Sequence, residues 1–456
     1  MTLLLRDADV GGRRVDVLVD GGRTVGVGPA GSGGTSGSGA TTPPRSPDTR
    51  PDEVVDCRGG ALLPGLVDHH LHLNALDVVR RSVRAPAEHT ALAAALAAAQ
   101  ADAHGWVRGV GYPGDDLDAA LLDRLHPDRP VRVQHRSGAL WVLNGRALEA
   151  LGGTDHPGVE RGADGTPTGR IFRADDWLRT RLPAATPPDL RELGAELAAL
   201  GLTALTDATP DLDRETAAAL TAVPQRLTLL GVPLDEAPPA GAVVGPYKIV
   251  LADPDLPPLD DLVARIRAAH AVGRSVAVHS VTRESLVLLV VALRESGIRP
   301  GDRVEHAAVV PAELIAELPA VVTQPGFLAD RGDRFRRETP EAEHGDLYRC
   351  ASLVAAGVPV ALSSDAPYGP VDPWAVIAAA TTRGTPDGGP LGPAERLTAR
   401  EALDRYLVAE PGGPPRRIVP GAPADLVLLQ DPLTEALRRP TAEQVRAVWI
   451  GGERRA

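Results

Sequence analysis

Residues 64–72 read Pro64-Gly65-Leu66-Val67-Asp68-His69-His70-Leu71-His72, and the interpretation of the chain starts from this stretch. The apolar residues that lead into it are typical of a buried strand. His70 and His72 follow at i and i+2, where that strand ends. Because alternate side chains of a strand point the same way, both imidazoles leave it on one face, close enough to bind one metal ion. Two unrelated surface histidines would give the same short pattern, so the rest of the chain has to decide.

The composition limits the class of protein. The chain has 456 residues, of which 43% are hydrophobic, which is enough for a barrel with a large core and a second domain. The net charge of -12 without a basic stripe argues against a nucleic-acid partner. Two cysteines, Cys57 and Cys350, form neither a CxxC pair nor a disulfide framework. The first residues lack the features of a signal peptide, and no apolar run reaches membrane-spanning length. We expect a cytoplasmic protein with no membrane partner.

Helix-like and strand-like segments alternate regularly after Pro188, as a parallel α/β fold requires. The strand candidates are residues 202–207, 226–230, 247–251, 275–279, 303–306, 321–324 and 359–363. The clearest helix candidates are residues 259–272, 283–296, 312–318 and 347–356. With the strand at the opening motif the count is eight. Eight βα units predict a (β/α)8 TIM barrel.

Both chain ends carry short strands and turns instead of this alternation. Gly21-Gly22 is a hairpin signal between two β-like runs near the N-terminus. Further along the chain, an Ala/Leu-rich helix is expected over Glu88–His104. We predict a small β-sandwich-like domain from residues 1–60 and 416–456, a disordered Gly/Ser/Pro-rich loop at 29–51, a barrel domain over 61–415, and an insertion at 105–181 after the first βα unit.

The predicted strand ends carry residues with metal chemistry. Catalytic groups of TIM barrels sit at the carboxyl ends of the strands. Those ends hold His70, His72, Lys248, His279, His306 and Asp365. Neutral imidazole suits Zn²⁺, and a carboxylate completes the shell. An ammonium group cannot ligate, but the carbamate that Lys248 would form with CO₂ can bridge two metals. An ordinary salt-bridging lysine is the alternative.

These motifs, taken in order, resemble the amidohydrolase superfamily of metal-dependent hydrolases over nearly the whole chain. The residues that carry the resemblance are 64–72, Lys248, Val278-His279, Val304-Glu305-His306, Ser363-Ser364-Asp365-Ala366-Pro367 and Gly421-Ala422-Pro423-Ala424-Asp425-Leu426-Val427. Within the superfamily the chain looks most like the branch that contains N-substituted formamide deformylases. Residues 106–112 and 135–144, and Asp365-Ala366-Pro367 followed by Asp372-Pro373, support that branch.

The resemblance implies a ligand set and a mechanism. His70 and His72 would hold the more buried metal together with Asp365, and His279 and His306 would hold a second. Carbamylated Lys248 would bridge them, so one or two divalent ions, with zinc expected, are implied as the cofactor. A metal-activated water would attack the substrate. Asp365 would be the catalytic residue that accepts the water's proton and passes it to the leaving amine.

Three features leave the site less defined. Glu305 is either an orienting partner of a ligand or a packing or salt-bridge residue on the opposite strand face, and strand alternation favours the second. Ala139 stands where many members of this branch carry histidine, which puts specificity in doubt. The segment from Lys248 to Leu259 is shorter than the long loop that is common in the family, which puts closure of a lid in doubt.

The insertion is where we expect substrate contacts. Arg136, Trp141 and Arg173 are candidates for binding a carboxylate or a ring. For each of them taken singly, the better reading is structural: Trp141 in the core of the insertion and both arginines solvated.

We expect a hydrolase that acts on a small-molecule substrate and cleaves a non-peptide C–N bond in an amide, formamide or cyclic amide. A homo-oligomer is compatible with this reading. The same metal barrel could serve a lyase or an isomerase, because a fold and a metal do not fix a reaction. A non-catalytic metal-binding relative is a third class, and the complete ligand set argues against it.

Overall fold

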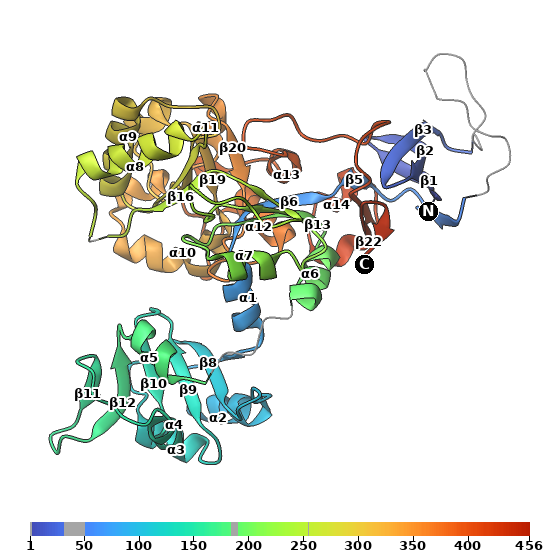
Figure 1. Ribbon diagram of the computed structural model, residues 1–456. Coiled ribbons are helices and arrows are strands. Elements are labelled where there is room, and N and C mark those ends of the chain that lie inside the picture. The colour runs from blue at the N-terminus through green and yellow to red at the C-terminus, as the bar shows by residue number, and fades with distance from the viewer. Residues whose placement is uncertain (1, 32–50, 184–189, 254) are drawn as a thin grey trace. The chain divides into compact units, whose positions relative to one another are not determined.

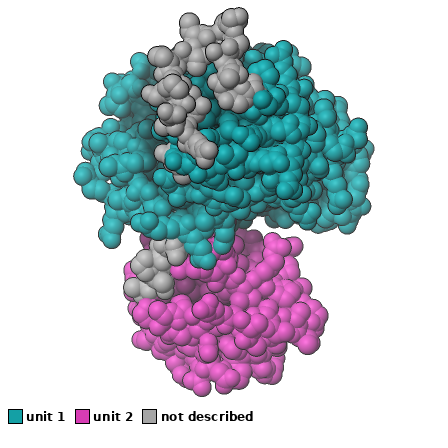
Figure 2. Space-filling model, turned by 90° about the vertical axis from the view of Figure 1, so that its right-hand side faces the viewer, with its two compact units in different colours: residues 1–73, 190–456 teal, residues 74–189 magenta. Residues whose placement is uncertain are grey.

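The structure is a computed structural model that describes residues 2–31, 51–183, 190–253 and 255–456. The chain divides into two compact units, residues 1–73 with 190–456 and residues 74–189 (Figure 2). The loop predicted at 29–51 falls almost entirely outside the described residues.

Two parallel sheets form the centre of the first unit. The first sheet has the order β15-β14-β13-β6, with β6 Leu66–Leu71, β13 Leu202–Asp207, β14 Arg226–Leu229 and β15 Ala242–Val244. The second has the order β16-β17-β18-β19-β20, with β16 Tyr247–Val250, β17 Val276–Ser280, β18 Arg303–His306, β19 Ala320–Thr323 and β20 Val360–Leu362. All eight predicted strands are confirmed. The short strand β15 was not predicted.

Backbone hydrogen bonds connect the two sheets on both sides. The N–H of Lys248, in β16, donates to the carbonyl of Leu230, directly after β14, at 3.2 Å. The N–H of Asp365, shortly after β20, donates to the carbonyl of His70, in β6, at 2.8 Å. The carboxyl ends of the first and last parallel strands therefore lie side by side.

Helices pack on the outer side of these strands (Figure 1). They are α6 Leu190–Ala199, α7 Arg214–Leu220, α8 Leu259–Ala271, α9 Arg283–Ser296, α10 Gly326–Glu338, α11 Ala351–Ala355, α12 Pro373–Thr382 and α13 Ala399–Leu407. Thr282 begins α9 with a capping box, in agreement with the predicted helix. The predicted helix at 312–318 is instead the 3₁₀ helix η1, Ala312–Glu317, which lies between Pro311 and Pro319.

Two four-stranded sheets come from the chain ends. One has the order β3-β2-β1-β4, with β1 Thr2–Val10, β2 Arg13–Asp20, β3 Arg23–Pro29 and β4 Glu53–Asp56. The other has the order β23-β22-β21-β5, with β5 Leu62–Pro64, β21 Leu426–Leu429, β22 Val445–Ile450 and β23 Glu453–Arg454. Gly21 and Gly22 both have positive φ, which confirms the predicted hairpin. Leu5, Leu428 and Trp449 belong to one buried cluster that both sheets share.

The second unit is built on a six-stranded sheet with its own buried clusters. Its order is β11-β12-β10-β9-β8-β7, with β7 Val83–Arg84, β8 Val107–Tyr112, β9 Val131–His135, β10 Leu140–Leu143, β11 Val159–Arg161 and β12 Pro167–Phe172. Its helices are α2 His89–Ala98, α3 Ala119–Leu125, α4 Gly145–Ala150 and α5 Asp175–Arg181, and α1, Leu73–Arg80, begins at the boundary between the units. The predicted insertion at 105–181 lies inside this unit.

The helix predicted over Glu88–His104 is shorter than expected. Glu88 caps α2, which ends at Ala98. Beyond it the Asp102 carboxylate accepts the N–H groups of His104 and Trp106, which holds the chain in a turn. Among the described residues, no helix combines the length and apolar character needed to cross a membrane.

Candidate metal centre

His70 and His72 lie at the carboxyl end of β6, where the sequence predicted them. Every residue of β6 is buried, and His72 follows directly after it. The two ring centroids are 5.4 Å apart. The i, i+2 spacing therefore places both imidazoles together, as strand alternation requires.

Asp365 is tied to this strand end through its backbone and its side chain. Besides the bond from its N–H to His70, the N–H of His72 donates to the carbonyl of Ala366 at 2.8 Å. The Oδ1 atom of Asp365 lies 3.4 Å from Nε2 of each histidine. The three side chains form a group whose ligand atoms all lie within 4.8 Å of one another.

The Asp68 side chain joins the same two segments through hydrogen bonds to their backbones. Its Oδ1 atom accepts the N–H of His70 at 3.1 Å and the N–H of Ser364 at 3.2 Å. One carboxylate oxygen thus holds both the histidine strand and the loop that carries Asp365. Burial raises the pKa of Asp68 to about 7.

Lys248 is buried beside this group. Its Nζ atom lies 3.4 Å from Nε2 of His70. In the described part of the chain, no ion pair within 4.0 Å joins Lys248 to a carboxylate. Burial lowers the pKa of the amine below its usual value, which favours the neutral form.

His306 and His279 form the other side of the cluster. The His306 ring lies 4.7 Å from that of His70 and 4.4 Å from that of His279. Its Nδ1 atom is 3.8 Å from Oδ2 of Asp365. Each of the six residues predicted at the strand ends therefore lies next to at least one of the others. The three whose ligand atoms lie close enough to share one ion are His70, His72 and Asp365.

Two ligand-orienting residues were missed from the sequence. Thr209 Oγ1 lies 3.1 Å from Nδ1 of His72. Gln324 Oε1 lies 2.9 Å from Nδ1 of His306, while its amide nitrogen donates to Ser363. Gln324 follows β19, so the strand-end rule that found the histidines could also have found it. Thr209 follows β13 by two residues, so the same rule could have found it too.

Glu305 combines the two roles that the sequence left open, because it contacts the ligand candidate His70 and also forms a salt bridge with Arg303. Its Oε2 atom lies 2.5 Å from Nδ1 of His70, and its Oε1 atom accepts from Nε of Arg303 at 2.6 Å. Alternation fails because His306 has a φ of 70°, in the left-handed region. The strand conformation ends there, so Glu305 and His306 both reach the cluster.

Burial keeps these imidazoles neutral. It lowers the pKa values of His70 and His306 well below the usual range and that of His279 to about 4, with Lys248 adding to the effect at His279. Metal ligation requires the neutral ring. Burial also raises the pKa of the Asp365 carboxyl.

A model of the amidohydrolase family matches residues 53–456. The chain belongs to the amidohydrolase family. Membership in this family makes the chain a hydrolase.

Two curated relatives and one solved structure illustrate the likeness. This amidohydrolase is 28% identical to YtcJ of Bacillus subtilis (strain 168) over 445 residues, which cover 80% of this chain and 82% of YtcJ. It is 26% identical to N-substituted formamide deformylase of Arthrobacter pascens over 529 residues, which cover 96% and 94% of the two chains. A crystal structure of an uncharacterized metal-dependent hydrolase from Pyrococcus horikoshii OT3 gives a TM-score of 0.74 at 19% identity, over 97% of this chain and all of that one. This last likeness concerns the fold.

The residues of this amidohydrolase fit a divalent metal. The Oδ1 atom of Asp365 is buried and has no hydrogen-bond partner in the described part of the chain. A buried polar atom without a partner is costly unless something else satisfies it. Two neutral imidazoles and one carboxylate are the donor set of many catalytic zinc sites.

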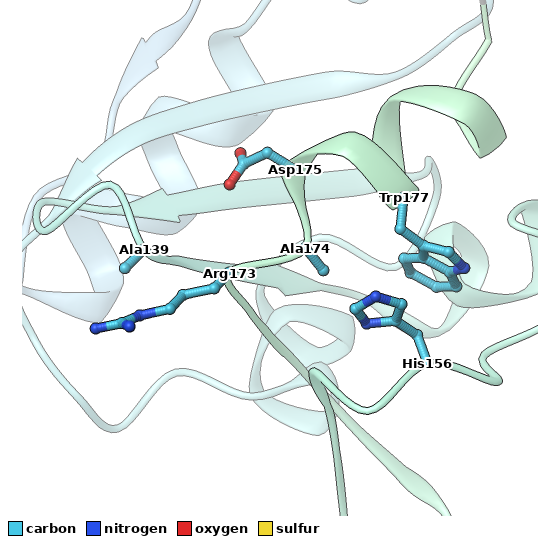
Figure 3. Close-up of a pocket in the computed structure, with 6 residues that line it drawn as sticks. All are labelled: Ala139, His156, Arg173, Ala174, Asp175 and Trp177. Carbon is cyan, nitrogen blue, oxygen red and sulfur yellow. The ribbon is translucent and has the colours of Figure 1, made fainter. Parts of the chain in front are cut away.

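A pocket of about 440 Å³ lies elsewhere in the amidohydrolase, within the second unit, and Ala139 and Arg173 line it (Figure 3). Trp177, at one side, stacks on His156 and has Arg181 over its ring at 5.1 Å. Trp141 is buried in this unit's core, as its structural reading predicted. Arg136 and Arg173 are exposed.

Proposed function

We propose that this chain is a metal-dependent amidohydrolase that cleaves a non-peptide C–N bond, in an amide, formamide or cyclic amide, with a metal-activated water. The group of His70, His72 and Asp365, in which His72 is partly exposed, carries the proposal. Of these three substrate classes, the name of the Arthrobacter relative, N-substituted formamide deformylase, supports the formamide.

The proposed scaffold is a (β/α)8 barrel closed from the two parallel sheets. The hydrogen bonds from Lys248 to Leu230 and from Asp365 to His70 support closure on both sides. The terminal sheets, with their shared core, would form a β-sandwich-like domain from residues 1–60 and 416–456. The barrel would then span 61–415.

We propose that His70, His72 and Asp365 hold one divalent ion, with zinc favoured by the donor set. His279 and His306 would hold a second ion if Lys248 is carboxylated to bridge the two. The buried amine beside His70 supports this role for Lys248. When bound, the metal supplies Lewis-acid chemistry, which lowers the pKa of a water and polarises a carbonyl.

Asp365 is the proposed proton carrier. Its Oδ1 atom, unpartnered in the described part of the chain, can accept a proton from the attacking water. The imidazoles around Asp365 are positioned by Glu305, Thr209 and Gln324.

Release of an amine or ammonia from an N-acyl library tests the function. Metal-loaded wild type should release amine, and Asp365→Asn should lower kcat by about 10²- to 10⁴-fold. The matched control is Asp128→Asn at an exposed site, which should behave as wild type. Failure of wild type to release amine across the library would contradict the proposal.

The same assay in H₂¹⁸O separates the competing reaction class. Hydrolysis places ¹⁸O in the carboxylic acid product, whereas a lyase or isomerase converts substrate without this label. A small-molecule substrate, a homo-oligomer and a cytoplasmic location stay predictions from the sequence.

A further inference from the structure

A buried ion pair lies behind His70, on the side away from Asp365. Glu305 has no exposed surface and Arg303 is 6% exposed. Both carboxylate oxygens of Glu305 are used, one by Nε of Arg303 at 2.6 Å and the other by Nδ1 of His70 at 2.5 Å. Arg303 also donates to the carbonyl of His69 at 3.2 Å.

This arrangement allows one assignment of protons. A guanidinium has only donors, so it needs the Oε1 atom of Glu305 as an acceptor. The paired carboxylate is an acceptor as well, so Nδ1 of His70 must carry the hydrogen between them. The lone pair of His70 is then on Nε2, the atom 3.4 Å from Asp365 Oδ1.

A buried ion pair is a weak source of stability, because both charges lose their hydration. Replacing such a pair with apolar residues of similar volume is often harmless to folding. In this protein, the Glu305 end of the ion pair contacts the candidate ligand His70. This contact points to a role in setting the tautomer and orientation of the imidazole.

We propose that Glu305, held by Arg303, is a positioning residue that fixes His70 in the Nδ1–H tautomer and thereby presents Nε2 to the metal. This inference rests on the proposed function. Arg303 acts indirectly, because its bond to Oε1 fixes which carboxylate oxygen faces His70.

Glu305→Gln tests this proposal directly, because the amide has the shape of the carboxylate but one acceptor fewer. Arg303 can only donate, so it takes the amide oxygen. The amide NH₂ then faces Nδ1 of His70 and donates to it. His70 must move its hydrogen to Nε2, where it blocks ligation.

The first measurement needs no metal and no activity. Imidazole ¹⁵N chemical shifts of metal-free protein distinguish the two tautomers, and the His70 signals are those lost in His70→Ala. Wild type should show the Nδ1–H form, and Glu305→Gln the Nε2–H form. Retention of the Nδ1–H form in Glu305→Gln would overturn the proposal. Because this result does not depend on a bound metal, it stands apart from failure of the proposed function.

The second measurement is Zn²⁺ affinity by competition with a chelating dye. Glu305→Gln should weaken binding by about 10- to 100-fold. Glu395→Gln is the matched control, since Glu395 is 4% exposed and pairs with Arg349 at 2.8 Å. Equal losses in both variants would indicate a general effect of breaking a buried pair and would also overturn the proposal.

Glu305→Asp decides the matter if Glu305→Gln does not fold. Aspartate keeps both acceptors but is one methylene shorter. His70 should stay in the Nδ1–H form while Zn²⁺ affinity falls, because the ring is no longer held in place. An affinity equal to that of wild type would contradict a positioning role.

Discussion

Asp365 and His70 contact each other through both backbone and side chain. The Asp365 N–H donates to the His70 carbonyl at 2.8 Å, and Asp365 Oδ1 lies 3.4 Å from His70 Nε2. The loop after β20 is thus held in place by the strand that supplies the histidines. A metal bound here would be held by groups that the backbone has already positioned, which lowers the entropy cost of binding.

Replacing His70 by alanine should remove the metal. The variant loses one ligand, so only Asp365 and His72 remain to bind the ion. Loss of a supporting residue already weakens metal binding by about tenfold or more. Metal content after dialysis should therefore fall by at least about tenfold. Elemental analysis of the purified protein measures this. Lys248→Ala should lose a second ion if one is present.

The control for this experiment is His104→Ala, a change at an exposed histidine. Its metal content should equal that of wild type. Unchanged metal content in both His70→Ala and Lys248→Ala would exclude the proposed site.

Thr209→Val should weaken the metal site moderately. Valine keeps the shape of threonine but removes the hydroxyl that lies 3.1 Å from Nδ1 of His72. Because His72 is partly exposed, water can replace the lost partner, so we expect a loss of Zn²⁺ affinity of about tenfold, the low end for a supporting residue. Thr382→Val, on an exposed helix position, is the control, and equal affinities in both variants would refute a supporting role for Thr209.

The histidines and Asp365 could be predicted because they depend on regular features. Strand alternation places His70 and His72 together, and the strand ends of a parallel sheet meet at one edge. The family resemblance then assigned roles that this pattern alone leaves open.

Glu305 could not be predicted in the same way, because alternation assigned the inward face of the strand to His306 and the outward face to Glu305. The left-handed φ of His306 ends the alternation, and histidine carries no sequence signal for that conformation. Thr209 and Asp68 likewise act through contacts between segments far apart in the chain. Such contacts follow from tertiary packing, which local patterns do not encode.

The core shared by the terminal sheets gives a stability prediction. Leu428 has no exposed surface and belongs to the same buried cluster as Leu5 of the other sheet. Leu428→Ala should lower the free energy of unfolding by about 2–5 kcal/mol, from lost burial and the cavity left behind. Urea denaturation measures the change. Val54→Ala, at a site 49% exposed, should change it by less than about 0.5 kcal/mol; similar values for the two variants would argue against a shared core.

Asp68 should make stability depend on pH. Burial raises the pKa of this carboxyl to about 7 in the folded protein, compared with about 4 when unfolded. The folded state therefore binds the proton more tightly, so this contribution to stability is complete below about pH 4 and is lost as the pH rises through 7. Asp68→Asn keeps an oxygen for the two N–H groups of His70 and Ser364 but cannot ionise. Between pH 5 and pH 8, wild type should lose about 2–3 kcal/mol more than this variant.

Urea denaturation of chelator-treated protein at pH 5, 6, 7 and 8 measures this difference. Chelation is needed because a bound metal would add its own pH dependence. The exposed Asp128→Asn variant is the control and should follow the wild-type curve. If Asp68→Asn also runs parallel to wild type, Asp68 is ionised in the fold. Its two N–H donors would then outweigh the cost of burial.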